Sequence, residues 1–530
     1  METALNQSPV SASEAVALTP AQMAKMLSDL SAENADLRRQ LAWFQRQIFG
    51  SKSERRLPPP DATQGLLGQD FSALPESPQT GKKSRVAAHE REAKPKSPRE
   101  GADESVPFFD EDKVPVRVIA VPNPEIAGLD PSDYEVIGEK ASYRLAQRPG
   151  AYEVIKYVRQ VIKRRDTQAL SCAPAPVGVI DGSRADVSFL AGMAIDKMVF
   201  HLPLYRQHRR LQDAGFKVSR SWLTTLMQQT VALLEPIYEA QLESIRTSRV
   251  LTMDETPIKA GTTGTGTMKA AYFWPVYGDR DEICFAYQPG RSGEDMKRAL
   301  GIDLPQGAVL LTDGYDVYAR YAEKIGLTHA QCWAHSRRHF YDSEDIEPER
   351  VAEALEMIGA LYKVEADIRD QNLAGDAKKQ YRQRHAKPLV ERFFAWVDKL
   401  FAAQGFLPSS PFTKALGYVR DRREGLEVFL SDPDVPIDTN HIERALRVIP
   451  MGKKNWLFCW TELGAKHVGI MQSLLATCRL HDVDPYDYLV DVLQRIGQHP
   501  ASKVEELTPR RWKELFASNP LRSDLHGLRT

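Results

Sequence analysis

Two aspartates stand just after apolar segments that are typical of buried β-strands. Asp254 follows "RVLTM", and Asp313 follows the apolar run 308–311 after a single threonine. If these strands are parallel neighbours, both carboxylates lie beyond the carboxyl ends of the strands, where open α/β sheets place their functional groups. Adjacent carboxylates repel each other unless they share a proton or a cation, and hard divalent cations prefer oxygen ligands. The pattern therefore predicts a metal site.

A third carboxylate, Glu443, comes much later, in "IDTNHIERALR". Asp438 or Thr439 is expected to cap a helix there, which places Asn440, Glu443 and Arg447 on one helix face. Two Mg²⁺ or Mn²⁺ ions about 3.5–4 Å apart can hold both the attacking and the leaving oxygen of a phosphodiester displacement. We expect two such ions, with three residues acting as both catalytic groups and metal ligands: Asp254, Asp313 and Glu443.

Other side chains near these acids are interpreted differently. Glu255 adjoins Asp254, but successive strand residues point to opposite faces, so we expect a solvated or salt-bridged carboxylate. Trp333, in "CWAHSRRHF", is expected to pack in the core. Basic residues around the acids are expected to contact DNA phosphates. These are His335, Arg337, Arg338, Arg444, Arg447, Lys453 and Lys454.

The elements that must position the acids follow a recognisable order. "SRVLTMDETPI", "MKAAYFWPVYG" and "EICFAYQPG" are typical of three antiparallel strands, and then helix, strand, helix and strand follow. This order favours a ribonuclease H-like mixed sheet within a multidomain α/β protein. We expect the catalytic core in 246–344 and 436–500, a helical insertion in 345–435, and a C-terminal tail in 501–530.

Residues 176–245 read as three helices, which resemble a helix-turn-helix. In that arrangement the third helix enters the major groove. Base contacts are then expected from Arg220, Thr224 and Gln228, and phosphate contacts from Arg206, Arg209 and Arg210. Three basic helices are also a common packing unit. The pattern alone therefore leaves two interpretations open, a DNA-binding helix-turn-helix and a purely structural group of helices.

The N-terminal third contains three different patterns. Residues 19–50 carry apolar positions at heptad spacing, which predicts a coiled coil that forms a homodimer or higher oligomer through 23–48. A single amphipathic helix packed on its own protein is the alternative. Residues 51–113, rich in Pro, Ser and charge, predict a flexible linker. Residues 114–175 carry alternating β-branched, aromatic and basic residues, which predicts a small β-rich module.

The composition excludes several classes of protein. At 530 residues the chain is long enough for several domains, and its net charge of −1 leaves DNA binding to local basic patches. It contains no apolar run near the ~18 residues of a membrane span, and its start lacks a signal-peptide pattern, so we expect a cytoplasmic protein without a membrane partner. The five cysteines are far apart and form no C-x-x-C pair, so reduced thiols are expected and zinc is not.

Several motifs together resemble a known family. "MDETPI", "LLTDGYDVY", "CWAHSRRHFYD", "IDTNHIERALR", "MGKKNW" and "DVDPYDYLVDVLQRIGQHP" are similar, in this order, to those of insertion sequence 66 (IS66) family transposases of the Asp-Asp-Glu type. Members commonly carry a zinc knuckle with paired cysteines in the β-rich module. Here that module keeps only Cys172, so it is interpreted as a degenerate knuckle without zinc.

The resemblance implies a bacterial, nucleoid-associated DNA transposase. Such a protein binds the terminal inverted repeats of an insertion sequence, cleaves a DNA strand and transfers it to target DNA in metal-dependent steps. It implies companion proteins encoded by the same element as possible partners. Two alternatives remain open at this point. One is a catalytically silent DNA-binding protein derived from a transposase, and the other is glycoside hydrolysis by a carboxylate pair, which needs no metal.

Overall fold

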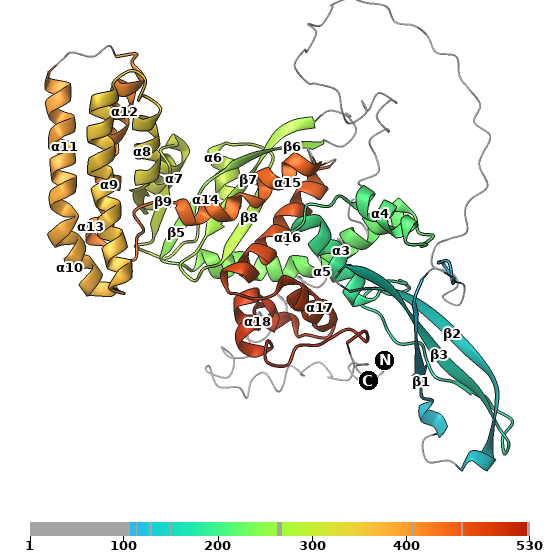
Figure 1. Ribbon diagram of the computed structural model, residues 1–530. Helices are drawn as coiled ribbons and strands as arrows, with labels where there is room; N and C mark the ends of the chain where they lie inside the picture. The colour runs from blue at the N-terminus through green and yellow to red at the C-terminus, as the bar shows by residue number, and fades with distance from the viewer. Residues whose placement is uncertain are drawn as a thin grey trace, which may run out of the picture.

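The computed structural model describes residues 107–526 except for 113, 127–129, 149, 262–267, 404–407, 457–458 and 460. The predicted coiled coil of 19–50 and nearly all of the predicted linker of 51–113 lie outside these residues. The described part is a mixed α/β structure, as expected. Figure 1 shows a central sheet with a helical bundle at one end and a long β-arm at the other.

The central sheet contains six strands, of which β5 and β6 lie along the same edge of β7. Their bounds are β5 (Val250–Met253), β6 (Thr256–Gly261), β7 (Met268–Tyr277), β8 (Ile283–Gln288), β9 (Val309–Thr312) and β10 (Thr328–Gln331). The strand order is β10-β9-β5-β7-β6, and β8 also pairs with β7. β5, β9 and β10 are parallel, whereas β7 is antiparallel to β5, β6 and β8. The sequence predicted one strand where the structure has β5 and β6, because Asp254 and Glu255 interrupt the pairing.

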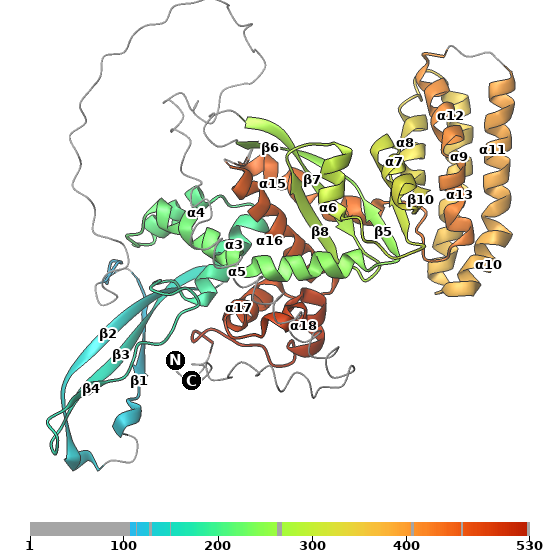
Figure 2. The ribbon, with the colours of Figure 1, turned by 180° about the vertical axis from the view of Figure 1, so that it is seen from behind.

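Helices cover both faces of this sheet. They are α5 (Arg220–Arg246), α6 (Gly293–Leu300), α7 (Asp316–Ile325), α8 (Trp333–Tyr341) and α16 (Glu462–Leu480). Figure 2 shows α5 running across the lower part of the sheet, on the side that faces the viewer in that view. Its buried stripe includes Leu226, Leu234, Ile237 and Ile245. This stripe keeps the 27-residue helix intact through Pro236, although a proline removes one helical hydrogen bond.

A helical bundle lies between β10 and the last part of the chain, over the residues for which the sequence predicts a helical insertion (Figure 1). Its helices are α9 (Pro348–Asp370), α10 (Gly375–His385), α11 (Lys387–Ala402), α12 (Pro411–Asp421) and α13 (Arg423–Ser431). Trp333 of α8 is fully buried among Phe393 and Phe394 of α11, and its Nε1 donates to the Leu426 carbonyl over 2.9 Å. The expected core packing of Trp333 is therefore confirmed, and it anchors the bundle to the sheet.

The β-arm and two short helices precede α5. The strands are β1 (Val116–Val121), β2 (Tyr134–Arg148), β3 (Ala151–Arg164) and β4 (Leu170–Cys172), with single turns η1 (Pro124–Ile126) and η2 (Pro131–Asp133). α3 (Val187–Met198) and α4 (Leu204–Asp213) then lead into α5. Gly215 has a φ of 93°, a conformation that glycine adopts most easily, and so permits the tight turn before α5.

The last part of the chain returns to the sheet. It contains α14 (Asn440–Leu446), α15 (Val448–Trp456), α16, α17 (Pro485–Arg495), η3 (Ala501–Leu507) and α18 (Pro509–Leu515). Residues 501–530 were expected to be a tail, but 501–515 are helical and Trp512 is 3% exposed. Trp512 packs against Tyr488 of α17, and this burial orders the segment.

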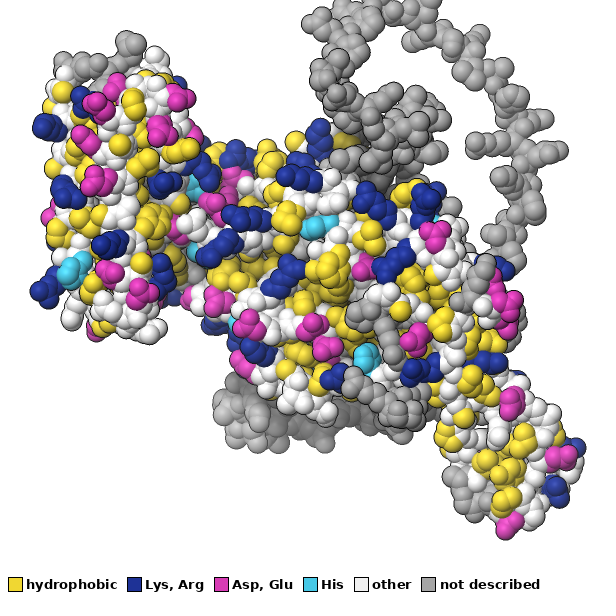
Figure 3. Space-filling view, viewed as in Figure 1, with side chains coloured by type: hydrophobic (Ala, Val, Ile, Leu, Met, Phe, Trp, Pro, Cys, Tyr) yellow, Lys and Arg dark blue, Asp and Glu magenta, His cyan; other side chains and the backbone are white. Residues whose placement is uncertain are grey.

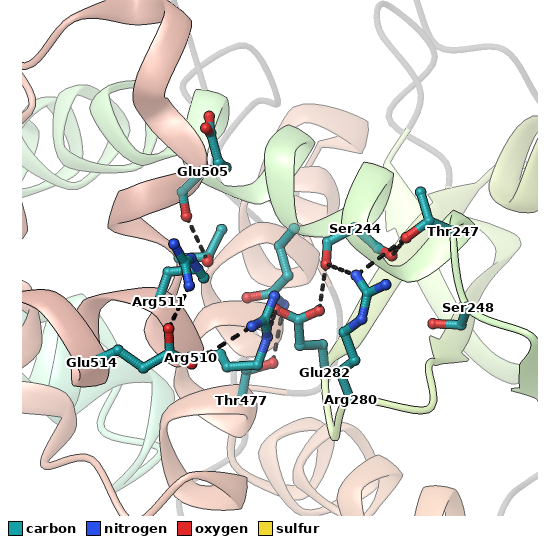
Figure 4. A network of polar contacts seen from close by, with 12 residues as sticks. Ser244, Thr247, Ser248, Arg280, Glu282, Thr477, Glu505, Arg510, Arg511 and Glu514 are labelled. Atoms are coloured by element: carbon teal, nitrogen blue, oxygen red, sulfur yellow. Dashed lines mark hydrogen bonds and ion pairs between the residues drawn. The ribbon is translucent and has the colours of Figure 1, made fainter. Parts of the chain in front are cut away.

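A buried acid holds this C-terminal part against α5 and the sheet (Figure 4). Glu282, which is 1% exposed, accepts hydrogen bonds from the Ser244 hydroxyl over 2.6 Å and from Arg510 Nε over 3.1 Å. Thr477 of α16 accepts a 3.2 Å hydrogen bond from the backbone N–H of Ile283. α5, α16 and α18 are thereby joined at the start of β8.

Within the described ranges, no helix is long and apolar enough to cross a membrane.

Candidate active site

Asp254 and Asp313 occupy equivalent positions at the ends of neighbouring parallel strands. Thr252 of β5 pairs with Leu311 of β9, and each aspartate follows two residues later. Counting on in this register places the two aspartates opposite each other. The backbone N–H of Tyr315 donates to Asp313 Oδ1 over 3.0 Å, and that of Glu255 donates to Asp254 Oδ1 over 2.7 Å. Both carboxylates are thus oriented by backbone donors of the turns that follow their strands.

The environment of Asp254 opposes its negative charge. Its pKa is raised to about 7, chiefly by burial, while the hydrogen bond from the Glu255 backbone N–H opposes the shift. The negative charges of Glu255, Asp313 and Glu443 raise the pKa of Asp254 as well. Asp254 therefore lies within electrostatic reach of both other predicted acids. A cation near them would relieve this repulsion.

Glu443 reaches the strand ends because α14 is attached to two strands. The backbone N–H and the hydroxyl of Thr439 both donate to Cys332 Sγ over 3.3 Å, directly after β10. His441 Nε2 lies 3.1 Å from the Thr252 hydroxyl in β5. Thr439 is the N-cap residue of α14 and its side chain makes no capping hydrogen bond, whereas Asp438 Oδ1 accepts a hydrogen bond from the Asn440 backbone N–H over 3.0 Å.

Glu443 already has basic neighbours. Its Oε1 lies 3.7 Å from His335 Nε2, and its Oε2 lies 3.7 Å from Arg338 Nη2. Glu443 Oε1 is buried and accepts no hydrogen bond. Within the described residues, no three His, Cys, Asp or Glu side chains are grouped so that they could hold a metal ion. The carboxylate oxygens of Asp254, Asp313 and Glu443 suit Mg²⁺ or Mn²⁺, and Glu443 Oε1 is available as a ligand. The three side chains must move closer together before they can hold the same ion.

Glu255 takes part in a separate network beneath the strand ends. Its side chain is 4% exposed and forms an ion pair with Arg291, whose Nε donates to Oε1 over 2.8 Å. The Tyr318 hydroxyl donates to its other oxygen. Burial raises the pKa of Glu255. The predicted salt bridge is present, and it is largely shielded from solvent.

Basic residues surround the acids on the surface. Arg337, Arg338, Arg444, Arg447 and Lys454 are exposed, whereas His335 and Lys453 are partly buried. Figure 3 shows Lys and Arg side chains gathered over α14 and α15. None of Arg444, Arg447, Lys453 and Lys454 forms an ion pair with a described acidic side chain. α14 ends at Leu446, so Arg447 lies at the junction with α15 rather than within one continuous helix.

The residues predicted to contact DNA from α4 and α5 differ in their surroundings. Arg206, Arg209 and Arg220 are exposed, whereas Thr224 and Gln228 are partly buried. Arg210 Nη1 lies 3.4 Å from Asp196 Oδ2, and its guanidinium lies over the Tyr152 ring. Arg210 therefore joins α4 to α3 and β3. One face of α5 packs against the sheet, α3, α4 and the C-terminal helices, while Arg220 in its first turn is exposed.

Sequence reasoning missed several residues that position the acids. His441 contacts β5, Arg291 contacts Glu255, and Arg422 of the insertion donates to the Gly314 carbonyl over 2.8 Å. These contacts join residues that are 36 to 189 positions apart. No local periodicity signals such pairs. The sequence shows Gly314 directly after Asp313, but it gives no sign that Gly314 contacts the helical insertion.

Comparisons with known proteins agree with the motifs. Residues 182–467 match the family model "Transposase IS66 family", and residues 473–510 match "IS66 C-terminal element". Residues 36–107 match "Transposase C of IS166 homeodomain". That stretch overlaps the predicted coiled coil and linker and lies almost entirely outside the described residues.

Two similar proteins come from Sinorhizobium fredii (strain NBRC 101917 / NGR234). The uncharacterized protein y4hP is 29% identical over 501 residues, which cover 90% of this chain and 88% of that protein. The uncharacterized protein y4qI is 31% identical over 419 residues, which cover 75% of this chain and 76% of that protein. Because the first family model spans more than half of the 530 residues, the chain belongs to the IS66 transposase family.

Proposed function

We propose that this protein is a DNA transposase that binds the terminal inverted repeats of an insertion sequence and carries out metal-dependent DNA strand cleavage and strand transfer. Asp254, Asp313 and Glu443 are the proposed catalytic residues. The observation that carries the proposal is the matched placement of Asp254 and Asp313 at the ends of β5 and β9, with Glu443 held by α14 within electrostatic reach of Asp254. The strand order and directions support a ribonuclease H-like core.

Each side chain has a proposed task. Asp254, Asp313 and Glu443 would hold two divalent ions, Mg²⁺ or Mn²⁺. When bound, such ions position the attacking and leaving oxygens of a phosphodiester and stabilise its developing negative charge. The backbone N–H of Tyr315 orients the Asp313 carboxylate. His335 and Arg338 would release Glu443 toward the ions and turn to the DNA phosphates.

DNA is the proposed macromolecular partner. The exposed cations of α14 and α15 border the acids, so a strand lying along them would pass the strand ends of β5 and β9. Arg206, Arg209 and Arg220 give a second basic surface at α4 and the start of α5, which supports a helix-turn-helix role for this region. Assembly through 23–48, and companion proteins of the same element as further partners, belong to the proposal as well.

A nicking assay on terminal-repeat DNA tests the catalytic assignment. Asp254→Asn should abolish Mn²⁺-dependent nicking and retain end binding, because the amide removes an anionic ligand without changing the surface. Asp303→Asn, an exposed aspartate between α6 and β9, is the matched control and should nick normally. Unimpaired nicking by Asp254→Asn would remove Asp254 from the site. Hydrolysis of a glycoside that survives a chelator would instead favour the carboxylate-pair alternative.

A catalytically silent DNA-binding protein is the second candidate. It is favoured by the contacts of Glu443 with His335 and Arg338, which leave the three acids apart in this conformation. Such a protein would shift terminal-repeat DNA in a gel and never nick it in Mn²⁺. The two candidates therefore differ in one measurement on the unmodified chain.

A further inference from the structure

The junction of α12 and α13 in the helical insertion contacts the turn that carries Asp313. Arg422, between α12 and α13, donates from Nη2 to the carbonyl oxygen of Gly314 over 2.8 Å. Gly314 directly follows Asp313. The same guanidinium nitrogen lies 3.8 Å from Asp316 Oδ1. A side chain of the insertion thus contacts the backbone beside a proposed metal ligand.

Arg422 is itself held in place. Its guanidinium lies over the Tyr418 ring, 4.1 Å from the ring centroid, and its Nη1 donates to the Tyr418 carbonyl over 3.3 Å. The Arg422 side chain is 21% exposed. The Tyr418 ring in turn packs against His339 of α8, with ring centroids 4.1 Å apart and the planes tilted by 38°. Arg422 is therefore fixed by packing on both the insertion and α8.

Gly314 leaves no room for a side chain at this contact. A Cβ atom there would lie 2.4 Å from Tyr418 Cε2 and 2.6 Å from Arg422 Nε. Nearby, a Cβ on Gly425 of α13 would lie 3.0 Å from the His329 carbonyl in β10. Side chains of the insertion therefore pack directly on the backbone after β9, and the backbone of α13 lies close to that of β10. This is closer than a surface brace requires.

On the other side, the same turn is held by Arg291, in the connection between β8 and α6. The Tyr315 hydroxyl donates to the Arg291 carbonyl over 2.8 Å, and the Arg291 guanidinium lies 4.0 Å from the centroid of the Tyr315 ring. The turn from Asp313 to Tyr315 is thus clamped between Arg291 of the β8–α6 connection and Arg422 of the insertion. Removal of Arg422 would free one side of the clamp and leave the other intact.

We infer that Arg422 is a positioning residue for Asp313, and that the helical insertion is a functional part of the active site. The inference rests on the proposed function, because it concerns the ability of Asp313 to ligate a divalent ion. Residues that orient metal ligands typically change metal affinity or activity by about 10–100-fold when they are removed. The insertion thereby sets how tightly the site binds its ion.

Mn²⁺ titrations of the full-length chain test this role. Arg422→Ala should raise the Mn²⁺ concentration for half-maximal nicking by roughly 10–100-fold and leave metal-free binding to terminal-repeat DNA unchanged. Arg422→Lys can still donate to the Gly314 carbonyl, so it should restore part of the loss. A residue that acts only on overall stability would change the amount of active protein and leave the half-maximal Mn²⁺ concentration unchanged.

Arg423 supplies the matched control. Its Nε donates to Glu427 over 2.9 Å and its guanidinium lies over Phe394, so its contacts remain inside the insertion. Arg423→Ala should keep the wild-type Mn²⁺ requirement. If Arg422→Ala also keeps it, the positioning role is overturned. Should Arg422→Ala fail to fold, Arg422→Met takes its place, because it keeps an aliphatic side chain against Tyr418 and loses the donor to the Gly314 carbonyl.

A second measurement separates this inference from the proposed function. Mn²⁺ that binds the folded chain raises its Tm, and this rise needs no catalysis. We expect a smaller rise in Arg422→Ala than in wild type and Arg423→Ala. A wild type that never nicks DNA would overturn the proposed function alone. An equal rise in wild type and Arg422→Ala would overturn the role of Arg422 alone.

Discussion

Nε2 of His441 lies 3.1 Å from the hydroxyl oxygen of Thr252. His441 belongs to the helix that carries Glu443, and Thr252 lies two residues before Asp254. The His441 ring also packs edge-on against Tyr277, with centroids 4.7 Å apart. This contact fixes α14 relative to β5, and so it fixes the distance across the proposed metal site.

Replacing His441 should weaken metal-dependent cleavage. His441→Leu keeps an apolar side chain against Tyr277 and loses the polar contact with Thr252, so α14 can shift. We expect nicking to fall by about 10–100-fold, with end binding retained. His499→Gln, far along the chain at the C-terminal side of α17, is the control in the same assay. Wild-type nicking by His441→Leu would show that α14 does not need this attachment.

Glu255→Gln should affect stability rather than metal dependence. The substitution removes the charge that pairs with Arg291, in a site where the Glu255 side chain is 4% exposed and the Arg291 side chain is 41% exposed. Because Arg291 keeps access to water, we expect a loss of about 1–3 kcal/mol, measured by denaturant unfolding. The Mn²⁺ requirement of the remaining folded protein should match wild type. A large shift in that requirement would make Glu255 a metal ligand.

The sequence predicted the strand ends well for a local reason. An apolar run that stops at Asp254 or Asp313 is a short-range signal, and parallel pairing turns it into a prediction about space. Glu443 was identified through its motif, because nothing local indicates that α14 docks on β5. The three-helix pattern of 176–245 does not specify where α5 ends, since its continuation to Arg246 depends on burial of Ile237 and Ile245 against other elements.

The residues that support the acids were not predictable in this way. Arg422 acts through the Gly314 carbonyl, 108 positions away, and the main chain of any residue could accept that bond. Glu282 and Arg510 form an ion pair across 228 positions, and neither stands in a distinctive pattern. Such contacts depend on how whole helices and strands pack together, whereas hydrophobic periodicity in the sequence describes only one helix or strand at a time.

Arg510→Ala should destabilise the chain by about 3 kcal/mol, because it leaves the buried Glu282 carboxylate without its cation. The expected loss is measured as a lower free energy of unfolding in denaturant. The adjacent Arg511→Ala removes an ion pair with Glu514 on the same helix, whose side chain is 49% exposed. That control should cost no more than about 1 kcal/mol. Equal effects of the two variants would contradict the importance of the Glu282 network.

Acid should destabilise the fold through His467. Burial lowers the pKa of His467 to about 4, and the charges of Lys197 and Lys466 lower it as well. In the unfolded chain His467 becomes protonated near pH 6.5, whereas in the folded chain it stays neutral until the pH approaches 4. The free energy of unfolding therefore falls as the pH drops from 6.5 toward 4. Between pH 7.5 and pH 5 the loss from this residue is about 2 kcal/mol. His467→Gln should flatten the dependence of unfolding free energy on pH, whereas the exposed His385→Gln should leave it unchanged.

The cations of α15 should set the salt dependence of DNA binding. Each phosphate contact adds about 0.9 to the slope of log affinity against log salt concentration, because it releases a condensed counterion. If Lys453 and Lys454 both contact phosphates, the double variant Lys453→Gln and Lys454→Gln should lower that slope by about 2. Lys387→Gln is the control, since its Nζ lies 4.0 Å from Glu391 within the insertion bundle. An unchanged slope in the double variant would move the DNA path away from α15. It would leave α4 and the start of α5 as the basic surface that holds the terminal repeats.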